Sequence, residues 1–219
     1  MPCLGRQRLW VTAIASSCLL LAPAAWAVSA PTPAQAAVAF YPVQLPEDRD
    51  NDLTQVRMHT QAASGVVVEL FGQIVDAQGE PVAGAQVEIW QADASGHYFN
   101  EHHGRDENFQ GYGQAISDSN GQYSFVTVRP GAVGTRAPHI NIAVSVAGKP
   151  RFVTQCYIRG ERHNASDPQL NALSNPARRE QLIVPFVPVA GAKVEKQVAR
   201  FDIVLGLNAP PTALAAHRS

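Results

Sequence analysis

Residues 66–90 read VVVELFGQIVDAQGEPVAGAQVEIW and most strongly determine the fold that we expect. The apolar, β-branched run at 66–75 and the alternating run at 85–90 are typical of strands. The segment between them, 76–81, carries Asp, Gly and Pro, and its glycine can adopt a positive φ, which favours a turn. This stretch therefore predicts two consecutive strands joined by a short connection.

The same pattern of short apolar runs and turn residues continues toward the C-terminus. Asn120-Gly121 is the strongest short hairpin signal in the chain. Further strands are expected at 122–128, 140–146, 152–158, 182–187 and 198–205, and no long segment has helical periodicity. We therefore predict an all-β, single-domain β-sandwich at 63–207, with an irregular N-terminal arm at 28–62 and long loops at its site.

The first 27 residues are typical of an export signal. Arg6 and Arg8 precede an apolar run at 9–21 that is too short for a typical membrane span, and Ala25-Trp26-Ala27 matches a cleavage site. We expect residues 1–27 to be removed, leaving a periplasmic or secreted protein without a stable membrane span. At the other end, residues 208–219 are expected to form a disordered tail.

Composition narrows the classes of partner and of covalent bond. The formal net charge of −1 attracts neither nucleic acid nor anionic lipid, and the 46% of hydrophobic residues can supply a core. Cys3 and Cys18 lie in the expected export signal, so that Cys156 remains alone. We expect it to be a small, buried strand residue, without an internal disulfide.

Polar side chains share one face of the strand expected at 140–146. Ile140 and Ile142 have the parity that faces the core, whereas His139 and Asn141 point to the opposite face. Either this second face is solvated, or it is the floor of a polar pocket. The residues that could complete such a pocket are Arg136, Gln155 and Tyr157.

The segment 98–113 is long, polar and without periodicity. A loop of this length inside a compact domain is more often functional than idle. It lies in a histidine-rich neighbourhood of His97, His102 and His103. Just before it, Glu88 and Asp93 are expected to be structural surface groups, and Trp90 to pack in the core or on the sheet.

A collinear series of segments resembles the intradiol ring-cleavage dioxygenase family, including the protocatechuate 3,4-dioxygenases. The segments are GQIVD at 72–76, GEPV at 79–82, GAQVEIWQAD at 84–93, GHY at 96–98, NFQGYG at 108–113, Asp118 with GQY at 121–123, RAPHI at 136–140 and TQCY at 154–157. The resemblance covers about residues 63–207, and the order of the segments carries it more than any one of them. It implies a β-sandwich of the intradiol dioxygenase type.

The resemblance also implies a ferric site that acts on catechol-type, protocatechuate-like aromatics with O2, as in aromatic catabolism. In the family, two tyrosinates and two histidines hold Fe(III), a hard ion whose charge phenolate oxygens offset. Catechol then binds through both oxygens, and the ring opens between the two hydroxyl-bearing carbons. By position, Tyr98 and His139 match iron ligands, while Arg136 and Gln155 match catalytic residues beside them.

Two ligand positions depart from the family pattern. Val133, in PGAV at 130–133, stands at the second tyrosine position, and Asn141 stands at the second histidine position. Both substitutions resemble the iron-free α chain of protocatechuate 3,4-dioxygenase, which lines the substrate pocket beside an iron-bearing β chain, whereas Gln155 follows the β pattern. The candidates for substitute ligands are His97, His102, His103 and Asn141; Val133 and Asn141 are also expected to line the substrate pocket.

The sequence leaves three functions open. The first is a working dioxygenase, alone with substitute ligands, as a homo-oligomer, or with an iron-bearing partner chain. The second is a non-catalytic, α-like or degenerate subunit that binds an aromatic acid or a catalytic chain. The third is an exported structural module of the transthyretin type, against which the Tyr98 loop and the segment 136–139 count. The first two require Tyr98 and His139 to converge on one site.

Overall fold

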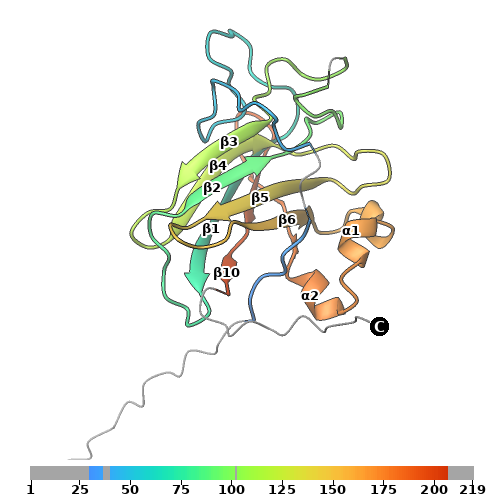
Figure 1. Ribbon diagram of the computed structural model, residues 1–219. Coiled ribbons are helices and arrows are strands. Elements are labelled where there is room, and N and C mark those ends of the chain that lie inside the picture. Colours follow the sequence, from blue (N-terminus) through green and yellow to red (C-terminus); the bar gives the residue numbers. More distant parts are fainter. Residues whose placement is uncertain (1–29, 37–39, 102, 207–219) are drawn as a thin grey trace, which may run out of the picture.

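The computed structural model describes residues 30–36, 40–101 and 103–206, and two β-sheets dominate this part of the chain (Figure 1). The expected export signal at 1–27 and the expected tail at 208–219 lie outside the described residues. The strands are β1 (Val67–Asp76), β2 (Gln86–Trp90), β3 (Tyr112–Ile116), β4 (Gln122–Val128), β5 (His139–Ser145), β6 (Phe152–Ile158), β7 (Ile183–Val184), β8 (Val187–Pro188), β9 (Lys196–Arg200) and β10 (Ile203–Leu205). The helical turns are η1 (Arg162–Ala165), α1 (Pro168–Asn171) and α2 (Pro176–Glu180), so the all-β prediction is confirmed.

The first sheet is built around β1, which pairs antiparallel with β4 and parallel with β9 and β10. The single strand expected at 198–205 is two strands, because the pairing with β1 is interrupted between them. The Phe201 carbonyl turns toward Tyr123 Oη, which donates to it at 2.6 Å. Only a glycine fits opposite, since a Cβ at Gly72 would lie 1.9 Å from that carbonyl oxygen.

The second sheet has the order β3-β2-β5-β6-β7. Its edge strand β3 was not expected from the sequence, because YGQAI contains a glycine and only one β-branched residue. The hydrogen-bonded pairing with β2 stabilises the extended conformation of β3, which its local strand propensity does not favour. The strand expected at 182–187 is divided into β7 and β8, which belong to different sheets, because Pro185 between them has no N–H to donate to a ladder.

The main core lies between the two sheets. Alternate residues of β1, β2 and β5 fill it, including Leu70, Ile74, Ile89, Ile140 and Ile142. Cys156 of β6 is buried there as a free thiol, as expected. Among the described residues, no helix is long and apolar enough to cross a membrane.

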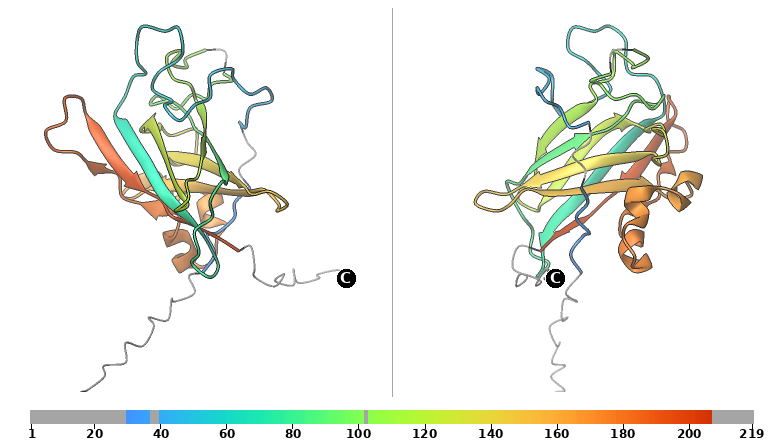
Figure 2. Two further views of the ribbon diagram at one scale, coloured as in Figure 1. Left: turned by 90° about the vertical axis from the view of Figure 1, so that its left-hand side faces the viewer. Right: turned by 45° about the vertical axis from the view of Figure 1, so that its right-hand side comes forward.

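The other face of the second sheet is also covered. Ala143 of β5 packs there with Trp90, Tyr98 and Tyr112 in a second buried cluster. Figure 2 shows the N-terminal arm, in blue, running along this side of the molecule. The possibility that this face of β5 is solvated was therefore wrong, because loops and the arm bury it.

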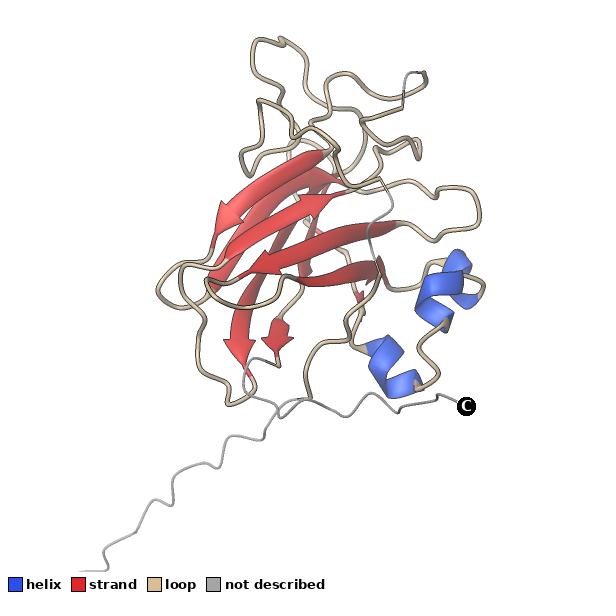
Figure 3. Cartoon of the chain, in the orientation of Figure 1, coloured by secondary structure: helices blue, strands red, loops and turns tan. Residues whose placement is uncertain are grey.

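Hydrogen bonds fix the arm to both sheets, and two short helices lie at one side of them. Thr32 exchanges hydrogen bonds with Val204 of β10, at 3.0 Å through its backbone N–H and 2.9 Å through its hydroxyl. Gln35 N donates to Val153 O of β6 at 2.9 Å. The short helices α1 and α2 lie at one side of the sandwich, near β6 (Figure 1 and Figure 3).

Candidate functional site

Tyr98 and His139 meet on the covered face of the second sheet. Tyr98 lies in the loop after β2 and His139 begins β5, 41 residues later, yet Tyr98 Oη is 3.3 Å from His139 Nε2. Both side chains are buried. The structure thus brings together the two residues on which the sequence-based interpretation of the site depends.

Asp93 positions the loop that carries Tyr98. Its Oδ1 accepts hydrogen bonds from Ser95 N at 2.8 Å and His97 N at 3.0 Å, and its Oδ2 accepts from Asp106 N at 2.7 Å. Asp93 is buried, so the expectation of a surface group was wrong. A carboxylate whose two oxygens accept three backbone N–H hydrogen bonds can be buried, because these charge-assisted bonds replace much of its lost hydration.

Gly96 lets this loop approach the segment that holds Val133. Gly96 has φ +93°, and a Cβ there would lie 2.3 Å from the Ala132 carbonyl oxygen. Val133 packs against the Trp90–Tyr98 cluster, and Arg136 N donates to Val133 O at 2.9 Å. Val133 therefore packs against the cluster that contains Tyr98, and its side chain presents only methyl groups.

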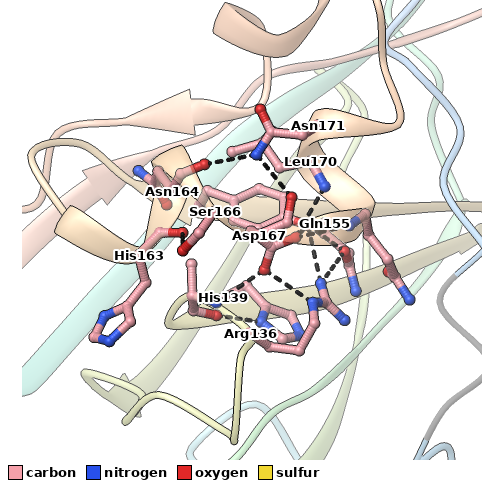
Figure 4. Close-up of polar contacts among 12 residues, drawn as sticks. Arg136, His139, Gln155, His163, Asn164, Ser166, Asp167, Leu170 and Asn171 are labelled. Atoms are coloured by element: carbon pink, nitrogen blue, oxygen red, sulfur yellow. Dashed lines mark hydrogen bonds and ion pairs between the residues drawn. The ribbon is translucent and has the colours of Figure 1, made fainter.

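Neighbouring strands supply the polar residues around His139. In the antiparallel β5–β6 pair, His139 lies opposite Tyr157 and Asn141 lies opposite Gln155. Arg136, just before β5, reaches across this pair and donates to Gln155 Oε1 at 2.8 Å and to Tyr157 Oη at 3.0 Å. Figure 4 shows Arg136, Gln155 and His139 gathered in this cluster.

A directed chain of hydrogen bonds connects Arg136 to Tyr98. Arg136 can only donate, so Gln155 turns its Oε1 toward the guanidinium and its Nε2 toward Asn141 Oδ1, at 2.7 Å. Asn141 Nδ2 then donates to the Trp90 carbonyl at 2.9 Å and to Tyr98 Oη at 3.1 Å. Because the guanidinium and the carbonyl each have one possible role, the orientation of both amides is fixed.

The same reasoning fixes the tautomer of His139. Its Nδ1 lies 2.6 Å from the Ala137 carbonyl oxygen, which can only accept, so Nδ1 carries the proton and Nε2 has a free lone pair. Burial lowers the pKa of His139 to about 4, and the nearby Arg136 charge acts in the same direction. The imidazole is therefore neutral near pH 7, and Nε2 accepts a hydrogen bond from the Tyr98 hydroxyl group.

Asp167 is a residue of this cluster that the sequence interpretation missed. It is fully buried, its Oδ2 accepts from Arg136 Nε and Ala137 N, both at 2.8 Å, and its Oδ1 caps α1 through Gln169 N and Leu170 N. Burial raises the pKa of this carboxyl, but hydrogen bonds from Leu170 N and Arg136 outweigh it and leave the pKa lowered. The dipeptide Asp167-Pro168 was the available signal, because Asp at the N-cap with Pro next to it is typical of a helix start.

The proposed substitute ligands differ in position. Asn141 lies within the cluster, whereas His97 is half-exposed, with Nδ1 4.0 Å from Asp93 Oδ1, and His103 is exposed. His102 lies outside the described residues. Within the described part of the chain, no hydrogen bond links His97 or His103 to Tyr98 or His139.

Glu88, also expected at the surface, is buried on the same face of the sheet. Its Oε1 accepts from Tyr41 Oη and Tyr112 Oη, both at 2.6 Å, and its Oε2 accepts from Arg151 at 2.8 Å. Burial raises the pKa of Glu88, but these hydrogen bonds and the Arg151 charge outweigh it, so that the pKa is lowered. The expectation was wrong because these partners come from β3, the arm and the loop before β6.

The residues present do not fit a ferric ion held by four protein donors. His139 Nε2 and Tyr98 Oη could each face a metal, but the third neighbour, Asn141 Nδ2, is an N–H donor and has no lone pair to give. Val133, which stands at the remaining ligand position of the family pattern, packs against the cluster that contains Tyr98 and has no donor atom in its side chain. Within the described residues, no group of three or more His, Cys, Asp and Glu side chains could hold a metal ion.

Comparisons with known proteins place the fold and the site in context. A family model described as Dioxygenase matches residues 41–206. The chain is 33% identical over 176 residues to the protocatechuate 3,4-dioxygenase beta chain of Burkholderia cepacia, covering 74% of each, and 34% identical over 163 residues to the alpha chain of the Pseudomonas putida enzyme, covering 71% of this chain and 78% of that one. A solved dioxygenase domain from a Streptomyces sp. SirexAA-E carbohydrate-binding fusion protein is similar in fold, with a TM-score of 0.62, 24% identity, and coverage of 81% of this chain and 99% of that domain.

Proposed function

The chain belongs to the intradiol ring-cleavage dioxygenase family, an oxidoreductase family that acts on catechol-type aromatics, and on that premise we propose what it does. We propose that the chain binds a catechol-type, protocatechuate-like aromatic without an iron of its own. Ring cleavage with O2 then takes place only beside an iron-bearing partner chain. We further propose, from the pattern of residues 1–27, that the protein is exported.

One observation carries this proposal: the amide N–H of Asn141 points at Tyr98 Oη, where the family has a histidine lone pair. A ferric ion needs electron-pair donors, and a neighbouring N–H excludes it from that position. The charges near the site also disfavour Fe(III). Only one phenolate, that of Tyr98, could offset the charge of the ion, and the positive Arg136 guanidinium lies close by.

The side chains that remain suit the hydroxyl groups of a neutral catechol. His139 Nε2 is a neutral acceptor near pH 7, and Tyr98 Oη can both donate and accept. Burial raises the pKa of Tyr98, so the phenol keeps its proton. A catechol hydroxyl can thus donate to His139 Nε2 in place of Tyr98, while Arg136 and Gln155 hold Asn141 in position.

A stand-alone dioxygenase is the second candidate, and the tautomer of His139 favours it. The Ala137 carbonyl holds Nδ1–H, which leaves the Nε2 lone pair directed at Tyr98 Oη, as a metal ligand requires. A purely structural module has no need of this buried arrangement.

Iron content and oxygen consumption test the proposal. The full chain, purified after exposure to Fe(III), should be colourless, should hold less than stoichiometric iron, and should consume no O2 with protocatechuate or catechol. Calorimetric titration of the same preparation should detect binding of protocatechuate, and weaker binding of benzoate, which lacks both hydroxyls. His139→Leu should remove the difference between the two ligands.

Two results would overturn the proposal. A red preparation with one iron per chain that consumes O2 by itself establishes the stand-alone enzyme instead. Equal, negligible binding of protocatechuate and benzoate by the wild-type chain eliminates the aromatic site.

A further inference from the structure

Phe40 of the N-terminal arm lies face to face with Tyr98. The two ring centroids are 4.3 Å apart and the ring planes differ by 7°. Tyr98 is 2% exposed, whereas Phe40 is 41% exposed. Among the described residues, Phe40 thus covers one face of the Tyr98 ring, and it makes the parallel contact that a planar aromatic ligand would make.

The backbone of Phe40 is in an unfavourable conformation. Its φ is +60°, in the left-handed region that bulky residues rarely adopt. The cost of this conformation is of the same order as the gain from one stacked aromatic pair. The stacked position of Phe40 is thus held with little net preference.

The next residue of the arm, Tyr41, is firmly held. Its hydroxyl donates to Glu88 Oε1 at 2.6 Å, its ring meets Trp90 edge-on at 5.0 Å, and the Arg151 guanidinium lies 4.5 Å from its ring centroid. These contacts keep Phe40 near the site whether or not it is stacked. Phe40 can then leave Tyr98 by rotation about its own bonds, with Tyr41 still in place.

We propose that Phe40 is a built-in aromatic cap on this site, which occupies the face of Tyr98 that a catechol-type ring takes and competes with that ring intramolecularly. The inference rests on the proposed function of the site and adds its regulation. An aromatic ligand binds only to the fraction of molecules in which Phe40 has moved off Tyr98, so the cap lowers the apparent affinity.

Affinity measurements on the iron-free full chain test the cap. Phe40→Ala should bind protocatechuate about twofold more tightly than wild type, because a stacked position with little net preference leaves Phe40 on Tyr98 in about half of the wild-type molecules. Phe40→Trp, which offers a larger ring to Tyr98, should bind it more weakly than wild type. Phe71→Ala is the matched control, because Phe71 of β1 is 40% exposed in the other sheet and should leave the affinity unchanged.

The outcomes separate the cap from the function on which it rests. If wild type binds protocatechuate and both Phe40 variants bind it equally well, the cap is overturned and the proposed function stands. If Phe71→Ala changes the affinity as Phe40→Ala does, a general effect of removing a ring explains the result and the cap is again overturned. If no variant binds protocatechuate or catechol, the proposed function fails, and the cap with it.

Discussion

At the scale of single residues, the chemistry of the site depends on which atom of Asn141 faces Tyr98. An asparagine side chain can present either a lone pair or an N–H group, and here residues beyond Tyr98 determine which of the two faces it. Arg136 fixes Gln155, and Gln155 together with the Trp90 carbonyl fixes Asn141. A network in which every member is satisfied has one orientation, because reversing any amide leaves buried groups unpaired.

Restoring the two absent donors should create an iron site. The double variant Val133→Tyr/Asn141→His places a phenol and an imidazole beside Tyr98 and His139, which gives the four donors that the family resemblance implies. After exposure to Fe(III), this variant should bind about one iron and become red through tyrosinate-to-iron charge transfer, measured by metal analysis and visible absorbance.

The matched control for that variant is the same protein with Tyr98→Phe added. It should lose most of the colour, because one of the phenolate donors is gone. A double variant that stays colourless, although folded by circular dichroism, would show that the backbone around Val133 cannot bring a tyrosine to the metal.

The sequence predicted those site residues that match positions of the family pattern, and it did not predict the others. Tyr98, His139, Arg136 and Gln155 were each matched by position, and the structure gathers them, while their roles remain proposals. Asp167 and Phe40 lie outside the segments that carry the family resemblance. They reach the site through long-range packing, and no local pattern records which loop or arm will cover a sheet.

At the scale of elements, Glu88 joins three separate pieces of the chain. It lies on β2, and its carboxylate accepts from Tyr112 of β3, Tyr41 of the arm and Arg151 before β6. Charged hydrogen bonds of this kind stabilise by about 1.5–3 kcal/mol each, and a buried partner left unpaired adds to the cost.

Glu88 should therefore make stability depend on pH. Its pKa is lower in the folded than in the unfolded chain, so its contribution is complete above its ordinary pKa and is lost as the pH falls through the folded value. Glu88→Gln should lower the free energy of unfolding by about 2 kcal/mol at pH 7, and the difference from wild type should shrink below about pH 4. Urea denaturation of both proteins from pH 7 to pH 3 measures this.

Glu69→Gln is the control for the loss of a carboxylate. The Glu69 side chain is 45% exposed and pairs with Lys196 on the surface, where ion pairs stabilise by only about 0–1 kcal/mol. If the Glu88→Gln difference stayed constant across this pH range, the negative charge would not be its source.

Strand prediction succeeded where the apolar alternation is local and failed where pairing decides. Residues 66–75, 85–90 and 152–158 carry their own β-branched or alternating pattern, and β1, β2 and β6 lie there. In contrast, β3 has a weak strand sequence and forms against β2. The division of β7 from β8 follows from Pro185, a signal that was present in the sequence and not used.

At the scale of the whole molecule, the sandwich could be expected from composition and periodicity, because many short strands with turn residues between them have few ways to bury their apolar faces. The second buried layer, on the outer face of the second sheet, could not be expected from composition or periodicity. It exists because the described parts of the arm and of the loop between β2 and β3 fold back over the outer face of the second sheet, and the packing of the entire domain decides this coverage.

The central place of β5 has a consequence for the time course of amide hydrogen exchange. β5 is paired on both edges, by β2 and β6, and both its faces are buried, so its amide protons should exchange among the slowest, by opening of the entire domain. The Tyr98 loop and Phe40 have no such ladder and should exchange much earlier. We therefore expect His139 and Asn141 to stay assembled in the native state, while the Tyr98 loop and Phe40 open and close over them before the protein unfolds.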